Sequence, residues 1–464
     1  MREGTTSDWP SVKLSEVGRI VTGSTPPKAR KEYYGGTFPF VKPGELLHCP
    51  VSESADRLSD AGSEIADVAP RGSVLVSCIG NLGKTGLATR PVAFNQQINA
   101  IVPHNTEHSK WVFYAVQTPD FVSQLSAASS ATTISIVNKG KFSTLEIPFA
   151  PDNEQSRVVA EIEKQFTRLE AGVAALRRVQ ANLKRYRAAV LKAACEGRLV
   201  PTEAELVKTG NRKAKFETGE ALLARILTER HQNWQGRGSF VQPVALDTTV
   251  LPKLPEGWTW ATVEQLSNVV RGASPRPAGD PRYFGGNVPW ITVGPLTADN
   301  SPYLKSVPAS LNELGQEHSR YIEPQTLLLT NSGATLGVPK ITLIGGCIND
   351  GVAALLNVGY PLKLYLLYFL RTRTERLRGL NQGAAQPNLN TTIIKSINVP
   401  LPPPTEQTRI VAEVERRLSV VEELEAMVSA NLQRATRLRQ SILQGAFTGK
   451  LIGEASSSIN QHKG

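Results

Sequence analysis

One short segment of the sequence carries residues that could bind phosphate. Residues 80–85, Gly-Asn-Leu-Gly-Lys-Thr, end like a phosphate-binding loop, in which backbone amides and the lysine hold a nucleotide. The complete pattern needs glycine at position 78, where the chain has Cys78, and the related segment 333–339 has no lysine. We therefore expect a turn between two strands, with Lys84 available to contact a DNA phosphate. A P-loop ATPase is the less favoured alternative.

Patterns for metal, thiol and methyl-transfer chemistry are absent from the sequence. The six histidines show no H-E-x-x-H or comparable ligand spacing, which argues against a zinc site. Cys49, Cys78, Cys195 and Cys347 are far apart, so we expect reduced and mostly buried thiols. There is no Asn/Asp-Pro-Pro-aromatic motif of adenine methylation and no glycine-rich cofactor loop. The sequence predicts no catalytic residue, no metal site and no cofactor bound by this chain.

Polar and basic residues in loops could instead contact DNA. The paired donors and acceptors of Asn and Gln, and the donors of Arg and Lys, match base edges in the major groove. For any one such residue, capping a turn or facing solvent is the more common role. The candidates for DNA contact are Ser24, Thr25, Lys28, Lys42, Asn81, Lys84, Asn95, Gln96, Asn138 and Lys139 in the first half of the chain, and Ser274, Arg276, Arg282, Asn331, Thr335, Gln386 and Asn388 in the second.

These candidates belong to two halves of a duplicated chain. The run Glu-Gln-Ser-Arg-Val-Val-Ala-Glu-Ile-Glu at 154–163 returns as Glu-Gln-Thr-Arg-Ile-Val-Ala-Glu-Val-Glu at 406–415, an offset of 252. Held without a gap, this offset gives 15 identical residues over the 46 positions 154–199. Two unrelated charged helices would not keep register over that length, so we infer an internal repeat.

The regions before these segments repeat more loosely, with offsets of 249 to 254. Each half therefore joins a variable region of about 150 residues to a more similar segment of about 45 residues. The matched features are Trp9 with Trp258, Gly-Ser-Thr-Pro at 23–26 with Gly-Ala-Ser-Pro at 272–275, Tyr-Tyr-Gly-Gly at 33–36 with Tyr-Phe-Gly-Gly at 283–286, and Asn138 with Asn390.

The more similar segments have the apolar spacing of paired helices. Their apolar residues alternate steps of three and four, which is typical of a coiled-coil seam. Gln180 and Arg187 interrupt one seam, and Glu425 and Arg439 the other. These polar residues could fix the register or mark where the seam opens towards a partner. The residues expected to pack the helix pair are Ile162, Phe166, Leu169, Val173, Leu176, Leu183, Val190, Val414, Leu418, Val421, Val428, Leu432 and Ile442.

The variable regions contain short β-rich runs bounded by Gly, Pro and Asn, with helical stretches between them. The expected fold class is α/β (α+β): two mixed α/β domains, separated by a long antiparallel two-helix coiled coil, with an internal pseudo-twofold repeat. The expected divisions are a first domain at 1–150, a spacer helix at 151–200, a linker with a helix at 201–254, a second domain at 255–402, a second spacer helix at 403–451 and a tail at 452–464.

The order of the segments favours antiparallel helices, because a parallel pair would need a long return of the chain. A helix of about 41 residues is roughly 60 Å long at 1.5 Å per residue, which corresponds to at most about two turns of B-DNA. The net charge of +11 favours a polyanionic partner, and its excess lies in the first helix, the linker and the second domain. Together these features indicate a ruler between two DNA-reading domains.

The duplicated motifs, taken in order, closely resemble the specificity (S) subunit of type I restriction-modification systems, the HsdS family. The resemblance covers nearly the whole chain. It implies two target-recognition domains, each reading one half of an asymmetric, bipartite double-stranded DNA target. It also implies helical spacers that set the gap between half-sites and dock two methyltransferase (M) subunits.

In this family scheme the chain itself is not an enzyme. The M subunits bind S-adenosylmethionine and methylate adenine at N6, and restriction (R) subunits use ATP and Mg for translocation and cleavage. Because the two variable regions differ, the half-sites are expected to differ.

Nothing at the N-terminus looks like a signal peptide, and the longest apolar stretch, 360–370, is interrupted by Lys363. A cytoplasmic protein without membrane contact is therefore expected. The alternative function is a coiled-coil scaffold or adaptor whose two globular domains bind proteins. That alternative predicts no sequence preference on DNA.

Overall fold

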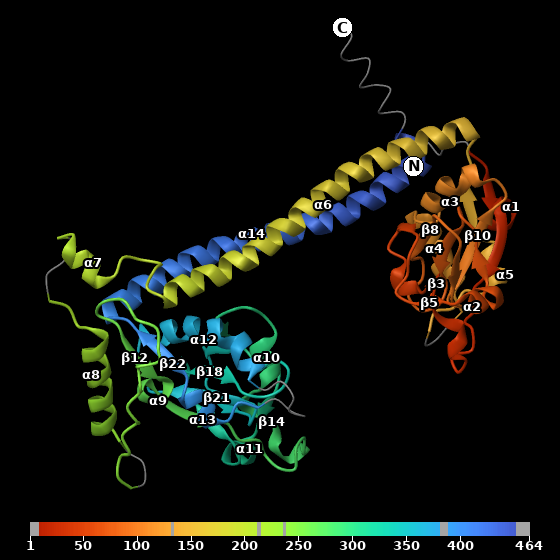
Figure 1. The fold of residues 1–464 in the computed structure, drawn as a ribbon. Coiled ribbons are helices and arrows are strands. Elements are labelled where there is room, and N and C mark those ends of the chain that lie inside the picture. The colour runs from red at the N-terminus through yellow and green to blue at the C-terminus, as the bar shows by residue number, and fades with distance from the viewer. Residues whose placement is uncertain (1–8, 131–133, 211–214, 235–237, 381–387, 452–464) are drawn as a thin grey trace, which may run out of the picture. The chain divides into compact units, whose positions relative to one another are not determined.

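The computed structural model describes residues 9–130, 134–210, 215–234, 238–380 and 388–451. The chain forms two compact units, and each contains one α/β domain (Figure 1). Unit 1 comprises Met1–Val179 and Met427–Gly464, and unit 2 comprises Gln180–Ala426.

The domain of unit 1 is built on two sheets. Its strands are β1 (Ser11–Lys13), β2 (Gly18–Thr22), β3 (Tyr34–Val41), β4 (Cys49–Val51), β5 (Arg57–Leu58), β6 (Val68–Ala69), β7 (Val74–Ser77), β8 (Thr85–Ala88), β9 (Val92–Phe94), β10 (Ile98–Pro103) and β11 (Glu146–Pro148). One sheet has the order β2-β10-β7-β8-β4 and the other β5-β3-β9-β6, while β1 pairs antiparallel with β11. The helices are α1 (Leu14–Val17), α2 (Asp60–Ile65), α3 (Ser109–Ala115), α4 (Pro119–Ala127) and α5 (Lys139–Ser143).

The domain of unit 2 repeats this topology strand for strand. Its strands are β12 (Thr259–Thr262), β13 (Asn268–Arg271), β14 (Phe284–Ile291), β15 (Tyr303–Leu304), β16 (Ser310–Leu311), β17 (Arg320–Ile322), β18 (Leu327–Thr330), β19 (Pro339–Thr342), β20 (Gly346–Ile348), β21 (Val352–Leu356) and β22 (Asn398–Leu401). The orders are β13-β21-β18-β19-β15 and β16-β14-β20-β17, with β12 paired to β22. The helices are α9 (Val263–Leu266), α10 (Val293–Thr297), α11 (Glu313–Glu317), α12 (Leu362–Gly379) and α13 (Thr391–Lys395). The same order of strands in both units is what a duplicated chain should give.

Each five-stranded sheet has an apolar central strand covered by a helix. All four residues of β7 and all four of β18 are buried, because an apolar core covers each face of the strand. Trp111 of α3 is fully buried in the core of unit 1, and Phe369 of α12 is fully buried in the core of unit 2. The mixed α/β fold class is thereby confirmed for both domains.

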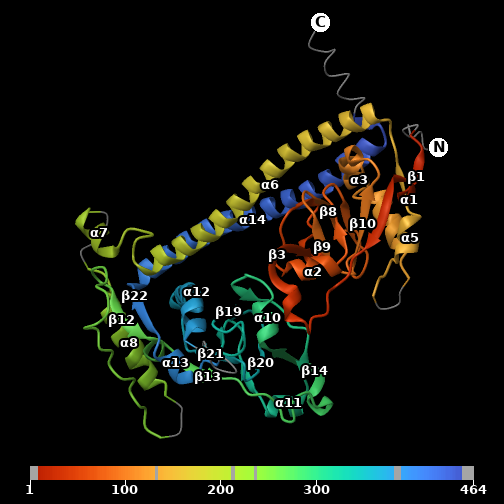
Figure 2. The same cartoon turned by 45° about the vertical axis from the view of Figure 1, so that its right-hand side comes forward.

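Two helices of 44 residues, α6 (Asp152–Cys195) and α14 (Pro404–Phe447), contribute to both units. In unit 1 the start of α6 packs on the end of α14, where Ile162 and Phe166 share a core with Ile442. In unit 2 the end of α6 packs on the start of α14, where Val190 shares a core with Val414. The two helices therefore run antiparallel in each unit, and they lie side by side in both views (Figures 1 and 2).

Two helices lie between α6 and β12, namely α7 (Glu203–Lys208) and α8 (Gly219–Gln232). The linker thus holds one helix more than the sequence pattern indicated. Basic residues at 212 and 213 of this linker and the tail at 452–464 lie outside the described residues. Across the part of the chain that the structure describes, every helix is too short or too polar to cross a membrane.

The repeated Glu-Gln motif ties the start of each long helix to its own domain. Glu154 accepts a hydrogen bond from Trp9 Nε1 at 2.7 Å, and Glu406 accepts one from Trp258 Nε1 at 2.9 Å. The next residue, Gln155 or Gln407, donates to a carbonyl five residues back, at 2.7 or 2.8 Å. These bonds satisfy polar groups at the helix start, so the motif and the matched tryptophans have a structural role.

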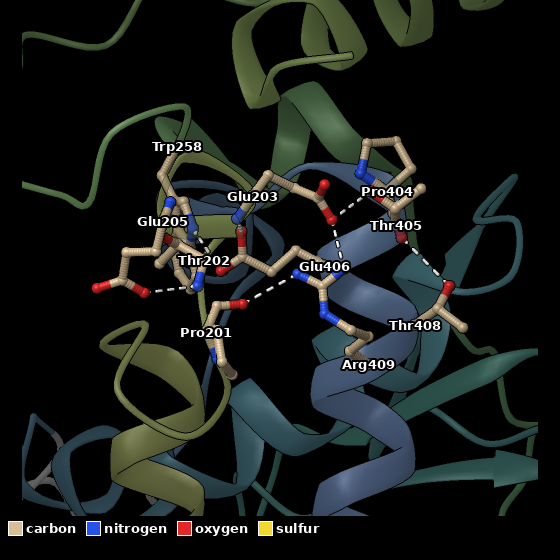
Figure 3. A network of polar contacts seen from close by, with 10 residues as sticks. All are labelled: Pro201, Thr202, Glu203, Glu205, Trp258, Pro404, Thr405, Glu406, Thr408 and Arg409. Carbon is tan, nitrogen blue, oxygen red and sulfur yellow. Dashed lines mark hydrogen bonds and ion pairs between the residues drawn. The ribbon is translucent and has the colours of Figure 1, made fainter. Parts of the chain in front are cut away.

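In unit 2 the segment after α6 joins this helix start (Figure 3). The N–H of Glu203 donates to Glu406 Oε2 at 3.1 Å, and both glutamates are fully buried. The Glu203 carboxylate accepts from Thr405 Oγ1 at 2.8 Å and forms an ion pair with Arg409, which also donates to the carbonyl of Pro201 at 3.0 Å. Burial raises the pKa of Glu406 to about 7 against the opposing hydrogen bonds.

Candidate nucleic-acid interface

In both units a glycine brings two loops into backbone contact. Gly23 donates its N–H to the carbonyl of Ile98 at 3.1 Å, and Gly272 donates to that of Val352 at 2.9 Å. A Cβ atom on either glycine would lie within 2.5 Å of carbonyl oxygens in the segment that leaves β9 or β20. Only glycine permits this approach. The Gly-x-Thr/Ser-Pro loop therefore lies against the residues that follow β9 in unit 1 and β20 in unit 2.

A cleft of about 730 Å³ lies beside this loop in unit 1 and brings together five predicted DNA-contact residues. Thr25 Oγ1 donates to Gln96 Oε1 at 2.6 Å, although 71 residues separate them. Lys42 forms an ion pair with Asp56. The residues that line the cleft are Thr25, Lys28, Tyr34, Phe40, Lys42, Asp56, Asn95, Gln96 and Gln97.

The equivalent loop of unit 2 has the same hydroxyl contact but different chemistry around it. Ser274 Oγ donates to Asp350 Oδ1 at 2.7 Å. Arg276 Nη2 lies 2.9 Å from Asp350 Oδ2, and Arg271 Nε donates to the Asp350 carbonyl at 2.7 Å. A carboxylate held by arginine therefore stands where unit 1 has an amide. Two of the predicted residues, Ser274 and Arg276, meet here.

The equivalent asparagines one residue earlier, Asn95 and Asn349, make the same backbone contact in both domains but differ in their side-chain contacts. The N–H of Asn95 donates to the carbonyl of Val41 at 3.2 Å, and that of Asn349 donates to Ile291 at 3.1 Å. Asn95 Nδ2 also donates to Gln97 Oε1 at 3.0 Å. The buried Oδ1 of Asn349 has no protein partner within the described residues. The two domains thus differ at successive positions along one loop.

The phosphate-loop alternative for 80–85 is wrong, because a strand follows the loop. A P-loop leads into a helix, whose N-terminus holds the phosphate, whereas Thr85 is fully buried at the start of β8. Ser77 closes the turn by accepting the N–H of Lys84 at 2.9 Å and donating to the Asn81 carbonyl at 2.6 Å. Thr330 closes the turn of unit 2 in the same way.

This turn pairs with the segment before α5 in unit 1 and with the segment before α13 in unit 2, where the predicted residue Asn388 takes part in the pairing. An isolated bridge joins Ile79 to Ile136 in unit 1 and Ser332 to Asn388 in unit 2. Lys139 and Thr335 are exposed. Asn138 is the N-cap of α5, where its side chain accepts the N–H of Lys141 at 2.9 Å, so it has a structural role.

The other candidates lie apart or carry local contacts. Ser24 Oγ accepts the N–H of Asp67 at 2.9 Å, and Arg282 binds the carboxylate of Asp280 at 2.7 Å. Asn331 is fully buried, and both polar atoms of its side chain lack a protein partner within the described ranges. Gln386 lies outside the described residues.

Of the four polar residues expected on the helix seam, Gln180 is exposed and the other three make side-chain contacts. In unit 2, Arg187 Nη2 donates to Glu425 Oε2 at 2.9 Å across the two helices. In unit 1, the Arg439 guanidinium lies 4.0 Å from the centre of the Phe166 ring and 3.5 Å from the Glu170 carboxylate. Pairing across the seam therefore explains Arg187 and Glu425. Arg439 also donates to Gln117 Oε1 of the α/β domain at 3.2 Å, so it connects the helix to that domain.

The expected seam residues are buried or half-buried in the structure. Ile162 and Val414 are the most enclosed, while Leu169, Val173, Leu176 and Leu432 are half-buried.

Some residues of the loop cluster were missed at the sequence level. Asp350, Arg271, Gln97 and Asp56 were not among the candidates, although Asp350 follows Asn349 just as Gln96 follows Asn95. Aligning the two copies through Gly-Cys-Ile-Asn-Asp and Val-Ala-Phe-Asn-Gln would have pointed to it.

Thiol and metal chemistry receive no support from the geometry. Burial raises the pKa values of Cys78 and Cys195 to about 12, which keeps both protonated at neutral pH. Cys347 is also buried, whereas Cys49 is half-buried, and all four thiols are free. Among the residues that the structure describes, no group of three or more His, Cys, Asp or Glu side chains could hold a metal ion.

Comparison with known proteins adds an independent line of evidence. Residues 6–175 and 255–428 match the family model described as the type I restriction modification DNA specificity domain. The type I restriction enzyme HindI specificity subunit of Haemophilus influenzae is 32% identical over 168 residues, which are 34% of this chain and 36% of that protein. The EcoDI specificity subunit of Escherichia coli is 21% identical over 453 residues, covering 96% of this chain and 89% of that protein.

Among solved structures, one chain of a type I R-M system, studied for complex assembly and conformational transition, has a TM-score of 0.63. It is 19% identical, and the match covers 97% of this chain and 99% of that one. At this identity the likeness concerns the fold.

Proposed function

Because this chain belongs to the type I restriction modification DNA specificity family, we propose that its two α/β domains read the two halves of a bipartite double-stranded DNA target. One observation carries the proposal. In both domains the hydroxyl of the Gly-x-Thr/Ser-Pro loop contacts the segment after β9 or β20, an arrangement that we call the loop frame. Its partner is Gln96 in one domain and Asp350, at the equivalent position, in the other. Side chains that differ on one frame suit two different half-sites, because base edges are distinguished by their donors and acceptors.

The chain supplies recognition, and partner subunits supply the chemistry. Two methyltransferase subunits dock on the helices, bind S-adenosylmethionine and methylate adenine N6. Restriction subunits, where present, bind ATP and Mg and cleave DNA, and the whole complex works in the cytoplasm. The similarity to specificity subunits of type I restriction enzymes supports a chain whose role is recognition.

The long helices set the gap between the half-sites. Each has 44 residues, or roughly 66 Å at 1.5 Å per residue. Arg187 and Glu425 hold the seam in one register, which a ruler requires. Adding one heptad to both helices, at paired positions, should change the number of unspecified base pairs between the half-sites. A gap that stays the same in the lengthened protein would contradict the ruler.

The direct test is to co-express the full chain with the methyltransferase subunit of its own system in a host that lacks other adenine methylation. Single-molecule sequencing then maps the methylated adenines. We expect one split, asymmetric motif. Replacing residues 1–150 with the first domain of a relative should change one half of the motif and leave the other half intact. A change in both halves would refute the two-reader model.

The competing function, a protein-binding scaffold, predicts a different result from the same experiment. Methylation would then be absent or would show no preference for sequence. The purified complex would also bind random duplexes as tightly as genomic fragments that carry the motif.

A further inference from the structure

We propose that Gln96 reads an adenine in one half-site and that Arg276, held by Asp350, reads a guanine in the other. This inference rests on the proposed function and deepens it, because it names the base that each loop recognises. It follows from one position in the repeated frame where the two domains carry different hydrogen-bonding groups.

The frame itself is the same in both domains. Gly23 and Gly272 each hold the Gly-x-Thr/Ser-Pro loop against the segment after β9 or β20. The hydroxyl of Thr25 then reaches Gln96 at 2.6 Å, and the hydroxyl of Ser274 reaches Asp350 at 2.7 Å. At this contact the domains differ in the side chain that each hydroxyl reaches. After Pro26 and Pro275 the loops also diverge, because Arg276 stands where unit 1 has Pro27.

The contact with Thr25 sets how Gln96 can meet a base. Its Oε1 accepts the hydroxyl hydrogen and keeps one lone pair, while both N–H donors of Nε2 stay available on an exposed side chain. One donor and one acceptor side by side match N7 and N6 of adenine. Lys28 lines the same cleft and adds a positive charge that suits the DNA backbone.

Asp350 cannot read adenine in this way, because an ionised carboxylate has no donor for N7. Both of its oxygens are already used, Oδ1 by Ser274 and Oδ2 by Arg276 at 2.9 Å. Asp350 is therefore a positioning residue. It holds a guanidinium whose side chain is 69% exposed, so its remaining N–H groups are free to meet a base. Two parallel N–H donors match O6 and N7 of guanine, which arginine contacts most often.

Two variants test the assignment in the full chain, co-expressed with its methyltransferase subunit. Gln96→Glu keeps an acceptor for Thr25 but removes both donors. Arg276→Gln removes the guanidinium fork. We expect each variant to lose preference at one base pair by on the order of 10- to 100-fold, an A·T pair for Gln96→Glu and a G·C pair for Arg276→Gln. The half-site of the other domain should stay unchanged, which also shows that the protein folds and assembles.

Arg90→Gln is the matched control for Arg276→Gln. Arg90 is likewise an exposed arginine paired with one carboxylate, that of Glu53 at 3.4 Å, and its loss should leave both half-sites unchanged. Where a variant abolishes methylation, binding of the purified complex to duplexes altered one pair at a time measures the same preference.

Several results would overturn the assignment. They are an unchanged motif in both variants, a half-site for 255–402 without a G·C pair, or a half-site for 1–150 without an A·T pair. Failure of the proposed function looks different, because the parent chain would then give no bipartite motif at all.

Discussion

The buried carboxylate of Glu406 should make the stability of unit 2 depend on pH. Its side chain is fully buried at the start of α14, beside the carboxylate of Glu203. Burial is the main cause that raises its pKa, from an ordinary 4.5 to about 7, and Glu203 adds to the effect. The bonds from Trp258 and the N–H of Glu203, together with the charge of Arg409, oppose the shift.

The direction and size of the effect follow from linkage. Below pH 4.5 the carboxyl is protonated in both the folded and the unfolded chain. As pH rises towards 7 the unfolded chain ionises first, so the folded state loses stability in that window. A difference of about 2.5 between the two pKa values corresponds to about 3 kcal/mol in the free energy of unfolding.

The perturbation that isolates this group is Glu406→Gln, which cannot ionise. The amide keeps one acceptor oxygen and loses one of the two bonds that Trp258 and Glu203 donate, a loss of about 1 kcal/mol at every pH. The parent should lose about 3 kcal/mol between pH 4.5 and pH 8 relative to the variant.

Urea unfolding of the full chain is followed at a series of pH values. Hydrogen–deuterium exchange of peptides from 404–426, the part of α14 that belongs to unit 2, measures this difference for unit 2. Glu154→Gln is the matched control, since it removes the equivalent carboxylate from unit 1 and should leave the pH profile of unit 2 as in the parent. A difference between parent and Glu406→Gln that stays constant from pH 4.5 to pH 8 would refute the reasoning.

Three further predictions concern the helix pair and a cap. Val421→Asp places a charge at a seam position that is 1% exposed and should destabilise unit 2 by at least about 3 kcal/mol in urea unfolding. The control, Val420→Asp, changes a residue that is 47% exposed and should alter the stability little. Equal losses of stability in the two variants would contradict the seam. A double-mutant cycle of Arg187→Ala and Glu425→Ala should give a coupling of about 1 kcal/mol, and zero coupling would show that the pair does not hold the register. Asn138→Ala should cost about 1 kcal/mol of stability and leave the methylated motif unchanged, because the Asn138 side chain caps α5. An altered motif would instead show that Asn138 contacts DNA.

Most of the architecture could be predicted from the amino-acid order, because it rests on local periodicity. The offset of 252 revealed the duplication, and steps of three and four placed the seam that buries Val421 and Val190. Such patterns can be recognised in the sequence, because helix pairing depends on residues that lie within two turns of each other. A turn between two strands was also expected at residues 80–85, because position 78 lacks the glycine that a phosphate-binding loop needs.

The contacts between the loops could not be predicted from the sequence, because they join residues far apart in the chain. Thr25 meets Gln96 only because β2 lies beside β10, and Ser274 meets Asp350, 76 residues away, only because β13 lies beside β21. Composition and spacing marked Asn138 as a candidate with the same weight as Gln96. Only the fold turned one of them into a helix cap.

The sequence by itself determined the repeat, the helical register and the family to which the chain belongs, because each depends on the order of residues along the chain. The tertiary structure decided which polar side chains share a loop and which carboxylate is buried beside another. Those properties depend on strand order and on exclusion of water, which no local pattern records.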